Sequence, residues 1–160
     1  MLVTILALLL GVQSLDTLSF MQGKWIGEGT SEMGAGAGYF TFEPDLAGKI
    51  WVRRNHAEYP GQNGAKPAVH DDLMIVYLDG ASTRAFYTDT EGHVIPYVVS
   101  MSADEQTVTF ISEPQPKQPR YRLTYVRLEP GRMTVTLEMA QPDHPDQFSR
   151  IVEGRVRKTP

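Results

Sequence analysis

The sequence contains no cysteine in its 160 residues. Disulfide bridges, thiolate metal sites, a cysteine nucleophile and a lipidated amino-terminal cysteine are therefore excluded. A basic surplus is also missing, because 15 Lys and Arg residues against 19 Asp and Glu residues give a formal net charge of -4. Nucleic acid is therefore not expected as a partner, since binding it requires a surplus of cations to neutralise phosphates.

Long hydrophobic runs are absent too. The apolar run from Leu2 to Val12 is shorter than the roughly 20 residues that a membrane-spanning helix needs. Val12 and Ser14 have the spacing that signal peptidase requires, so residues 1–14 are interpreted as a signal peptide. No Lys or Arg precedes Lys24, and a buried amino-terminal element is the alternative. We expect a secreted or periplasmic protein, otherwise a cytoplasmic one, with no membrane span after removal of the leader.

Helical patterns are scarce in residues 15–160, which have the length of a single domain. Between Leu15 and Gln22 apolar residues recur at a spacing of three, and Gly23 follows as a stop, which predicts one or two helical turns. The remainder alternates β-branched and aromatic runs with turn signals such as Asp79-Gly80. We expect strands at Trp25–Ser31, Tyr39–Glu43, Lys49–Ala57, Leu73–Leu78, Arg84–Thr88, His93–Met101, Thr107–Ser112, Tyr121–Leu128, Met133–Met139 and Phe148–Arg157.

No helix long enough for a parallel crossover lies between these strands, so the sheet should be antiparallel. Apolar and polar residues alternate from Met133 to Met139, which indicates that one face of the sheet is apolar and the other is exposed to solvent. We predict an all-β domain, an up-and-down antiparallel β-barrel of about ten strands with a short N-terminal helical turn. A two-sheet sandwich is the alternative, and contact between the first and last strands decides between them.

Strong polar groups follow the apolar start of the third strand. Continuing the alternation from Ile50 and Val52 places Arg54 and His56 inside, whereas the opposite phase places Arg53 there. A buried arginine needs an anionic or carbonyl partner. That partner is either a ligand carboxylate or an acidic residue of the chain itself.

Histidines and carboxylates are neighbours at several points. His93, Ile95 and Tyr97 share one face of the sixth strand, where an imidazole and a phenol could bind a carbonyl group or act as acid and base. The spacing of His56, His70 and His93 matches no metal motif, and we expect no metal.

The opening of the first strand, Gly23-Lys24-Trp25-Ile26-Gly27-Glu28-Gly29, resembles that of the lipocalin-like and nitrobindin-like β-barrels, which begin with Gly-x-Trp-x-Gly-x-Gly. The resemblance implies a barrel with an internal cavity. Nitrobindin-like barrels bind haem through a histidine near the carboxyl terminus, but the segment Phe148–Arg157 contains none. No cofactor is therefore expected.

We expect this barrel to bind a small hydrophobic or amphipathic molecule; the oligomeric state is left open. The alternative is a cofactor-independent isomerase or cyclase that uses His56 or His93, with Tyr97, as acid and base. We also expect the loop Tyr59–His70 and the turn Leu15–Gln22 to gate the same mouth. The expected ligand-binding residues are Trp25, Phe40, Arg54, His56, Tyr77, Phe86, His93, Ile95, Tyr97, Phe110, Tyr121 and Met139.

Overall fold

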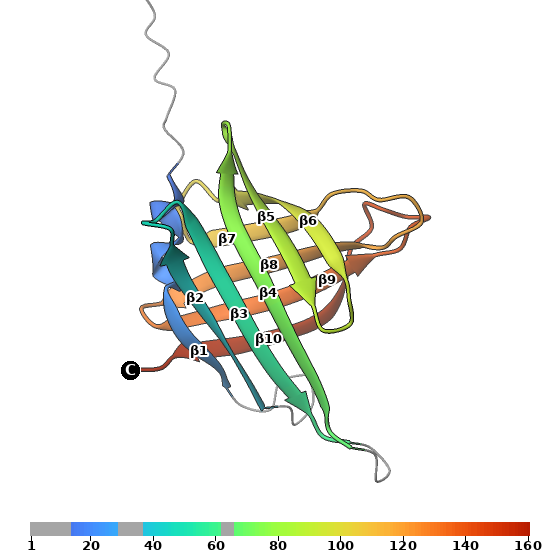
Figure 1. Ribbon diagram of the computed structural model, residues 1–160, viewed down its shortest axis with the longest axis horizontal. Coiled ribbons are helices and arrows are strands. Elements are labelled where there is room, and N and C mark those ends of the chain that lie inside the picture. Colours follow the sequence, from blue (N-terminus) through green and yellow to red (C-terminus); the bar gives the residue numbers. More distant parts are fainter. Residues whose placement is uncertain (1–13, 29–36, 62–65) are drawn as a thin grey trace, which may run out of the picture.

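A computed structural model describes residues 14–28, 37–61 and 66–160 of the chain. They form ten antiparallel strands that close into a barrel, preceded by a short 3-10 helix (Figure 1). In chain order the elements are η1 (Leu15–Met21), β1 (Gly23–Glu28), β2 (Ala37–Asp45), β3 (Ile50–Tyr59), β4 (Ala68–Asp79), β5 (Ser82–Asp89), β6 (Val94–Met101), β7 (Thr107–Ser112), β8 (Arg120–Glu129), β9 (Arg132–Ala140) and β10 (Ser149–Lys158).

The barrel is closed by pairing between its first and last strands. β1 runs antiparallel to β10, with Trp25 opposite Lys158 and Glu28 opposite Arg155. All other pairs join strands that are consecutive in the chain. The predicted ten-stranded up-and-down barrel with its N-terminal helical turn is therefore confirmed, and the two-sheet alternative is excluded. Residues 1–13 of the predicted signal peptide lie outside the described residues.

The two ends of the barrel differ. At one end, here called the helix end, η1 lies beside the turn that joins β2 to β3, and Gln22 Nε2 donates to Glu43 Oε2 at 3.2 Å. The opposite end, the loop end, carries the connections that follow β3, β5, β7 and β9 (Figure 1). The expectation that η1 and the loop Tyr59–His70 gate the same mouth is wrong, because they lie at opposite ends. His70 itself belongs to β4.

Side chains of η1 and β1 fill the helix end. Leu15, Leu18 and Met21 are buried, and Trp25 keeps only 1% of its surface exposed. The indole Nε1 of Trp25 donates to the carbonyl oxygen of Met21 at 2.6 Å, which ties the helix to the barrel. This single residue therefore supplies both bulk and a buried hydrogen bond at the closed end.

The inner face of β3 carries Trp51, Arg53 and Asn55 instead of Arg54 and His56. Residues directly opposite each other in antiparallel strands share a face. Arg53 lies opposite Phe42 on β2 and Met74 on β4, and both of these side chains are fully buried. The prediction that Arg54 and His56 point inward is therefore wrong, because the registers with β2 and β4 override the apolar start at Ile50 and Val52.

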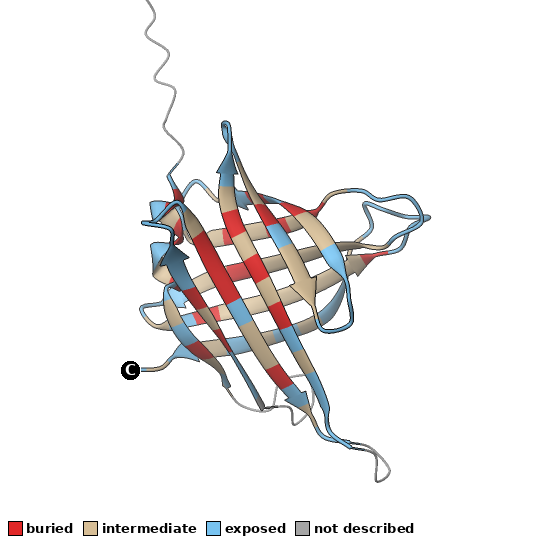
Figure 2. Cartoon of the chain, viewed as in Figure 1, coloured by how far each residue is buried: buried red, intermediate tan, exposed pale blue. Residues whose placement is uncertain are grey.

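The interior is less completely filled toward the loop end. Inward side chains on β8, β9 and β10 are only half-buried there, and Figure 2 shows long intermediate stretches on β8 and β9. On β1, β2 and β3, which follow β10 around the barrel, the inner positions Gly27, Gly38 and Ala57 carry little or no side chain. Because inward residues gain exposure only from inside a closed barrel, solvent reaches this part of the interior. The half-buried inward residues are Tyr121, Leu123, Val135, Leu137, Met139 and Val152.

Replacing Trp25 by alanine should lower the free energy of unfolding by about 3–5 kcal/mol, because a large buried side chain leaves a cavity and its hydrogen bond is lost. Urea denaturation measures this loss. Phe86→Ala is the matched control, since Phe86 lies on the outer face with 40% exposure, and it should cost roughly 1 kcal/mol or less. Equal losses in the two variants would contradict the role assigned to Trp25.

Candidate functional site

A buried ion pair lies on the inner face of β3 and β4. Arg53 donates from Nη1 to Asp72 Oδ1, and the two side chains are 9% and 4% exposed. Burying two charges is costly unless they neutralise each other, and removing one partner leaves the other uncompensated. From the sequence alone, an inward arginine could have met either a ligand or an acidic residue of the chain. Its partner is Asp72.

Hydrogen-bonding capacity remains unused beside this pair. Among the described residues, the buried Nε of Arg53 and the buried hydroxyl of Tyr125 have no hydrogen-bond partner of acceptable geometry. Burial raises the pKa of Tyr125, against the opposing effect of the Arg53 charge, and burial likewise raises the pKa of Tyr97. Both phenols are therefore protonated at neutral pH and can donate a hydrogen bond.

Polar contacts continue from the ion pair toward the loop end. His70 lies on the same inner face, with its Nε2 3.4 Å from Asp72 Oδ2 and 3.3 Å from the Tyr87 hydroxyl oxygen. Its Nδ1 lies 2.8 Å from Glu91 Oε2. Burial raises the pKa of Tyr87, and Asp72 adds to the rise. The interior thus contains a connected set of ionisable groups that reaches from buried Arg53 to exposed Glu91.

Asp89 anchors the turn that follows β5. Its carboxylate accepts from the Tyr87 hydroxyl at 3.0 Å and from the backbone N–H of His93 at 2.9 Å. Burial alone would raise the pKa of Asp89, but the hydrogen bonds from His93 and Tyr87 outweigh it and hold the pKa below its ordinary value. β6 begins only at Val94, and the His93 side chain is 62% exposed. The prediction that His93 shares the inner face with Ile95 and Tyr97 is therefore wrong.

One group of ligand atoms has a spacing that suits a cation. Donor atoms of His70, Asp89 and Glu91 all lie within 4.8 Å of one another. Each of these residues already makes hydrogen bonds within the protein. The group therefore does not by itself indicate a metal site.

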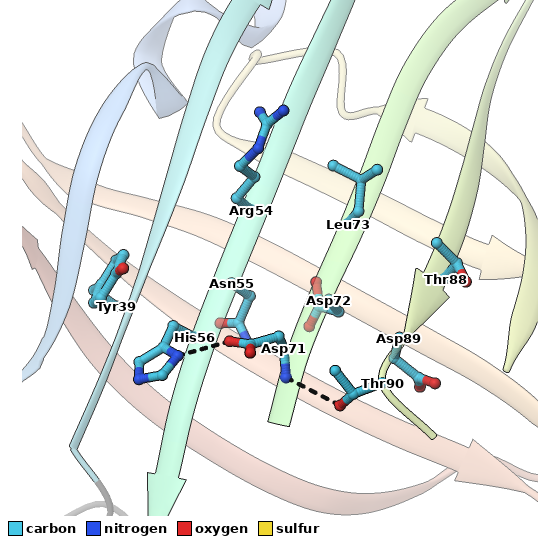
Figure 3. Close-up of a pocket in the computed structure, with 10 residues that line it drawn as sticks. All are labelled: Tyr39, Arg54, Asn55, His56, Asp71, Asp72, Leu73, Thr88, Asp89 and Thr90. Atoms are coloured by element: carbon cyan, nitrogen blue, oxygen red, sulfur yellow. Dashed lines mark hydrogen bonds and ion pairs between the residues drawn. The ribbon is translucent and has the colours of Figure 1, made fainter. Parts of the chain in front are cut away.

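A hollow of about 470 Å³ lies over β2 to β5 (Figure 3). Most of its lining residues belong to the outward-facing set, so it lies on the outer face. Here His56 Nδ1 is 2.6 Å from Asp71 Oδ1, and its Nε2 is 3.1 Å from Glu58 Oε1. These two hydrogen bonds raise the pKa of His56 above its ordinary value near 6.5. The lining residues are Tyr39, Arg54, Asn55, His56, Asp71, Asp72, Leu73, Thr88, Asp89 and Thr90.

The expected site residues divide between the two faces of the barrel. Arg54, Tyr77 and Phe86 lie on the outer face with His56, and His93 lies in a turn. The inward ones are Trp25, Phe40, Ile95, Tyr97, Phe110, Tyr121 and Met139.

Sequence reasoning missed the polar residues of the interior. The sequence contained one signal for them. Asp72 is in phase with Met74 and Val76, and these two apolar residues are typical of the buried face of a strand. A charged residue in phase with such a face indicates a buried charge. The interior polar residues that were not predicted to face inward are His70, Asp72, Tyr87 and Asp89.

No protein-family model matches this chain, and no curated protein matches it. In the described residues 14–28, 37–61 and 66–160, no helix is long and apolar enough to cross a membrane.

Replacing Asp72 by alanine should lower the free energy of unfolding by about 3–5 kcal/mol, because Arg53 would stay buried without its counter-ion. Removing both charges in the double variant Arg53→Met/Asp72→Leu should recover most of this loss. Asp71→Ala is the control, because Asp71 is the exposed neighbour on the outer face and should cost much less. A double variant that is no more stable than Asp72→Ala would argue against a buried charge as the cause.

The His56 imidazole should titrate above 6.5 in NMR spectra, because Asp71 and Glu58 stabilise its charged form. Asp71→Asn should lower this pKa more than Glu58→Gln, since Asp71 makes the closer contact. A raised pKa stabilises the folded state fully below the unfolded pKa, and this contribution disappears as the pH rises through the folded value. If neither substitution moves the His56 pKa, the assigned contacts are not formed in solution.

Proposed function

We propose that this protein binds a small amphipathic molecule inside the barrel. The observation that carries the proposal is a set of half-buried apolar side chains on the inner face, in a barrel whose interior also holds the buried Arg53–Asp72 ion pair. Ligand cavities are mostly apolar and contain a few placed polar groups that orient the ligand. The apolar part would lie against β8, β9 and β10, and the polar part would point toward Arg53.

The shape of the interior supports this proposal. Gly38 leaves no room for a side chain, since an added Cβ would lie 2.8 Å from the carbonyl oxygen of His56. At Gly27, by contrast, an added Cβ would meet no atom of residues 14–28, 37–61 or 66–160 within 4 Å. Space is therefore available on the inner face of β1, next to β10 and its half-buried apolar side chains. A barrel of this size is about wide enough for one small ligand.

Proton transfer is a second candidate function, and one observation favours it. Neither His56 nor His93, the expected bases, lies on the inner face, but His70 does, and it is close to Tyr87 and Asp72. A histidine between a phenol and a carboxylate has the contacts that general acid–base catalysis uses. Under this candidate an isomerase or cyclase reaction would depend on His70. A ligand recovered unchanged after incubation with the protein would count against it.

The resemblance of the first strand to the lipocalin-like barrels supports a binding role, and we propose a relationship on that motif together with the closed barrel. Secretion or a periplasmic location is likewise proposed from the leader pattern alone.

Filling the space at Gly27 tests the binding proposal. Gly27→Phe should weaken binding of the neutral fluorescent probe N-phenyl-1-naphthylamine by roughly tenfold or more, because the new ring projects into the interior. Ile26→Phe is the matched control, since Ile26 lies on the outer face opposite Tyr39. Fluorescence titration gives the affinities, and circular dichroism establishes that both variants are folded.

Native mass spectrometry of protein purified from its own host is the second arm of this test, because a retained molecule would appear as a defined mass. A folded Gly27→Phe variant that binds the probe as tightly as the original protein would contradict a site inside the barrel.

A further inference from the structure

We propose that the loop end of the barrel binds a divalent transition-metal ion such as Zn²⁺ through His70, Asp89 and Glu91. This site does not depend on the ligand proposed above. The spacing of the histidines matches no metal motif, but the register of β4 and β5 combines one histidine with two carboxylates that are distant from it in the sequence. Besides the distances among the three side chains, two features support the site: a carboxylate charge without a fixed counter-charge, and a further carboxylate behind the histidine.

The strand register gathers the three ligands on one face. Asp72 on β4 lies opposite Asp89 on β5, so the next inner positions along the two strands are those of His70 and Glu91. The Nδ1 of His70 lies 2.8 Å from Glu91 Oε2, and donor atoms of the three side chains lie within 4.8 Å of one another. Around a Zn²⁺ ion with bonds of about 2.0–2.2 Å, neighbouring ligand atoms lie roughly 3–3.5 Å apart. A small rotation of the exposed Glu91 side chain brings the group to this spacing.

An ion can reach these side chains from solvent. The side chain of Glu91 is 47% exposed and that of His70 is 27% exposed. Asp89 is only 3% exposed, but it also lines the hollow of about 470 Å³. The His93 imidazole, itself 62% exposed, lies 2.8 Å from Asp89 Oδ2, and this is the contact that an ion would replace. The group therefore lies at the rim of the barrel and not within its packed core.

The carboxylate charge of the group has no fixed counter-charge. Among the described residues, neither Asp89 nor Glu91 pairs with a lysine or an arginine, and each has its ion-pair contact with a histidine. The nearby Arg53 is already paired with Asp72. A nearly buried carboxylate such as that of Asp89 is costly without a counter-charge. An ion between Asp89 and Glu91 would supply it.

Supporting contacts lie behind two of the ligands. The Nε2 of His70 lies 3.4 Å from Asp72 Oδ2, and Asp72 is 4% exposed and fixed by Arg53. A histidine that binds a metal through one ring nitrogen commonly presents the other to a carboxylate, which fixes the orientation of the ring. Asp89 is held as well, because the Tyr87 hydroxyl donates to its Oδ2 at 3.0 Å. Both ligands are therefore oriented by neighbours that take no part in binding the ion.

The kinds of ligand atom indicate the kind of ion. One imidazole nitrogen with two carboxylate oxygens suits Zn²⁺ and its first-row neighbours, whereas Ca²⁺ and Mg²⁺ are bound by oxygen ligands. Three protein ligands leave a position for water or for a polar group of a bound molecule. We therefore expect Zn²⁺ to bind more tightly than Ca²⁺ or Mg²⁺.

Isothermal titration calorimetry of the full chain, freed of metal with EDTA and dialysed, tests the site. A single Zn²⁺ ion should bind per chain, and Ca²⁺ and Mg²⁺ should bind roughly tenfold or more weakly. His70→Ala, Asp89→Asn and Glu91→Gln should each weaken Zn²⁺ binding by roughly tenfold or more, because each removes a ligand. His56→Ala is the matched control and should leave the affinity unchanged, since His56 also contacts two carboxylates but lies on the outer face.

Thermal unfolding gives a second readout, because an ion that binds only the folded state raises the melting temperature. Zn²⁺ should raise it in the original protein and in His56→Ala, and not in His70→Ala. Absence of Zn²⁺ binding, or equal Zn²⁺ affinity in the folded His70→Ala and His56→Ala variants, would overturn the proposed metal site. Titration of the metal-free protein with N-phenyl-1-naphthylamine tests the proposed function separately, so failure of either proposal leaves the other standing.

Discussion

Pairing between β1 and β10 is the constraint on which the rest of this structure depends. An open sheet of this length would have two exposed edges and two faces to cover, whereas closure removes the edges and leaves one interior. In a closed barrel the alternation along every strand has the same result: one set of residues faces the interior and the other faces solvent. The position of Arg53 within the interior follows from that closure.

The interior is divided between an apolar end and a polar one. At the helix end Trp25 and the buried face of η1 complete a packed core, so this end contributes stability. Toward the loop end the inner residues become small, half-buried or ionisable. Ligand sites in barrels need such a division, because a fully packed interior binds nothing and an unfilled one does not hold the fold together.

Burying the Arg53–Asp72 pair costs desolvation free energy, and hydrophobic residues of similar volume would stabilise the core as well or better. Its contacts explain why it is nevertheless informative. The pair lies where the packed core ends. Within the part of the chain that the structure describes, neither Arg53 Nε nor the buried hydroxyl of Tyr125 has a hydrogen-bond partner of acceptable geometry. Such unsatisfied groups are rare in folded proteins and point to a role other than packing.

The sequence alone indicated about ten strands, their order along the chain and their antiparallel pairing, because period-two alternation and turn residues are local properties of the chain. The pairing of β1 with β10, which distinguishes a closed barrel from a two-sheet sandwich, was decided by the tertiary structure. The sequence also indicated the helical turn before Gly23 and the absence of any crossover helix. The positions of η1 and the β3–β4 connection at opposite ends follow from the same strand order, because successive connections of an up-and-down barrel alternate between its ends.

Only the tertiary structure decided which face of β3 points inward. Ile50, Trp51 and Val52 are consecutive apolar residues, so the phase of the alternation was ambiguous at the point where the charged residues begin. The register with the neighbouring strands fixed the inward face of β3. Phe42 and Met74 lie opposite Arg53 and are buried, so Arg53 shares their inner face. Likewise, hydrogen bonds from the backbone N–H groups of Glu91 and His93 to Asp89 keep His93 in a turn. Both outcomes depend on cross-strand register and side-chain capping, which bring together residues that no local pattern relates.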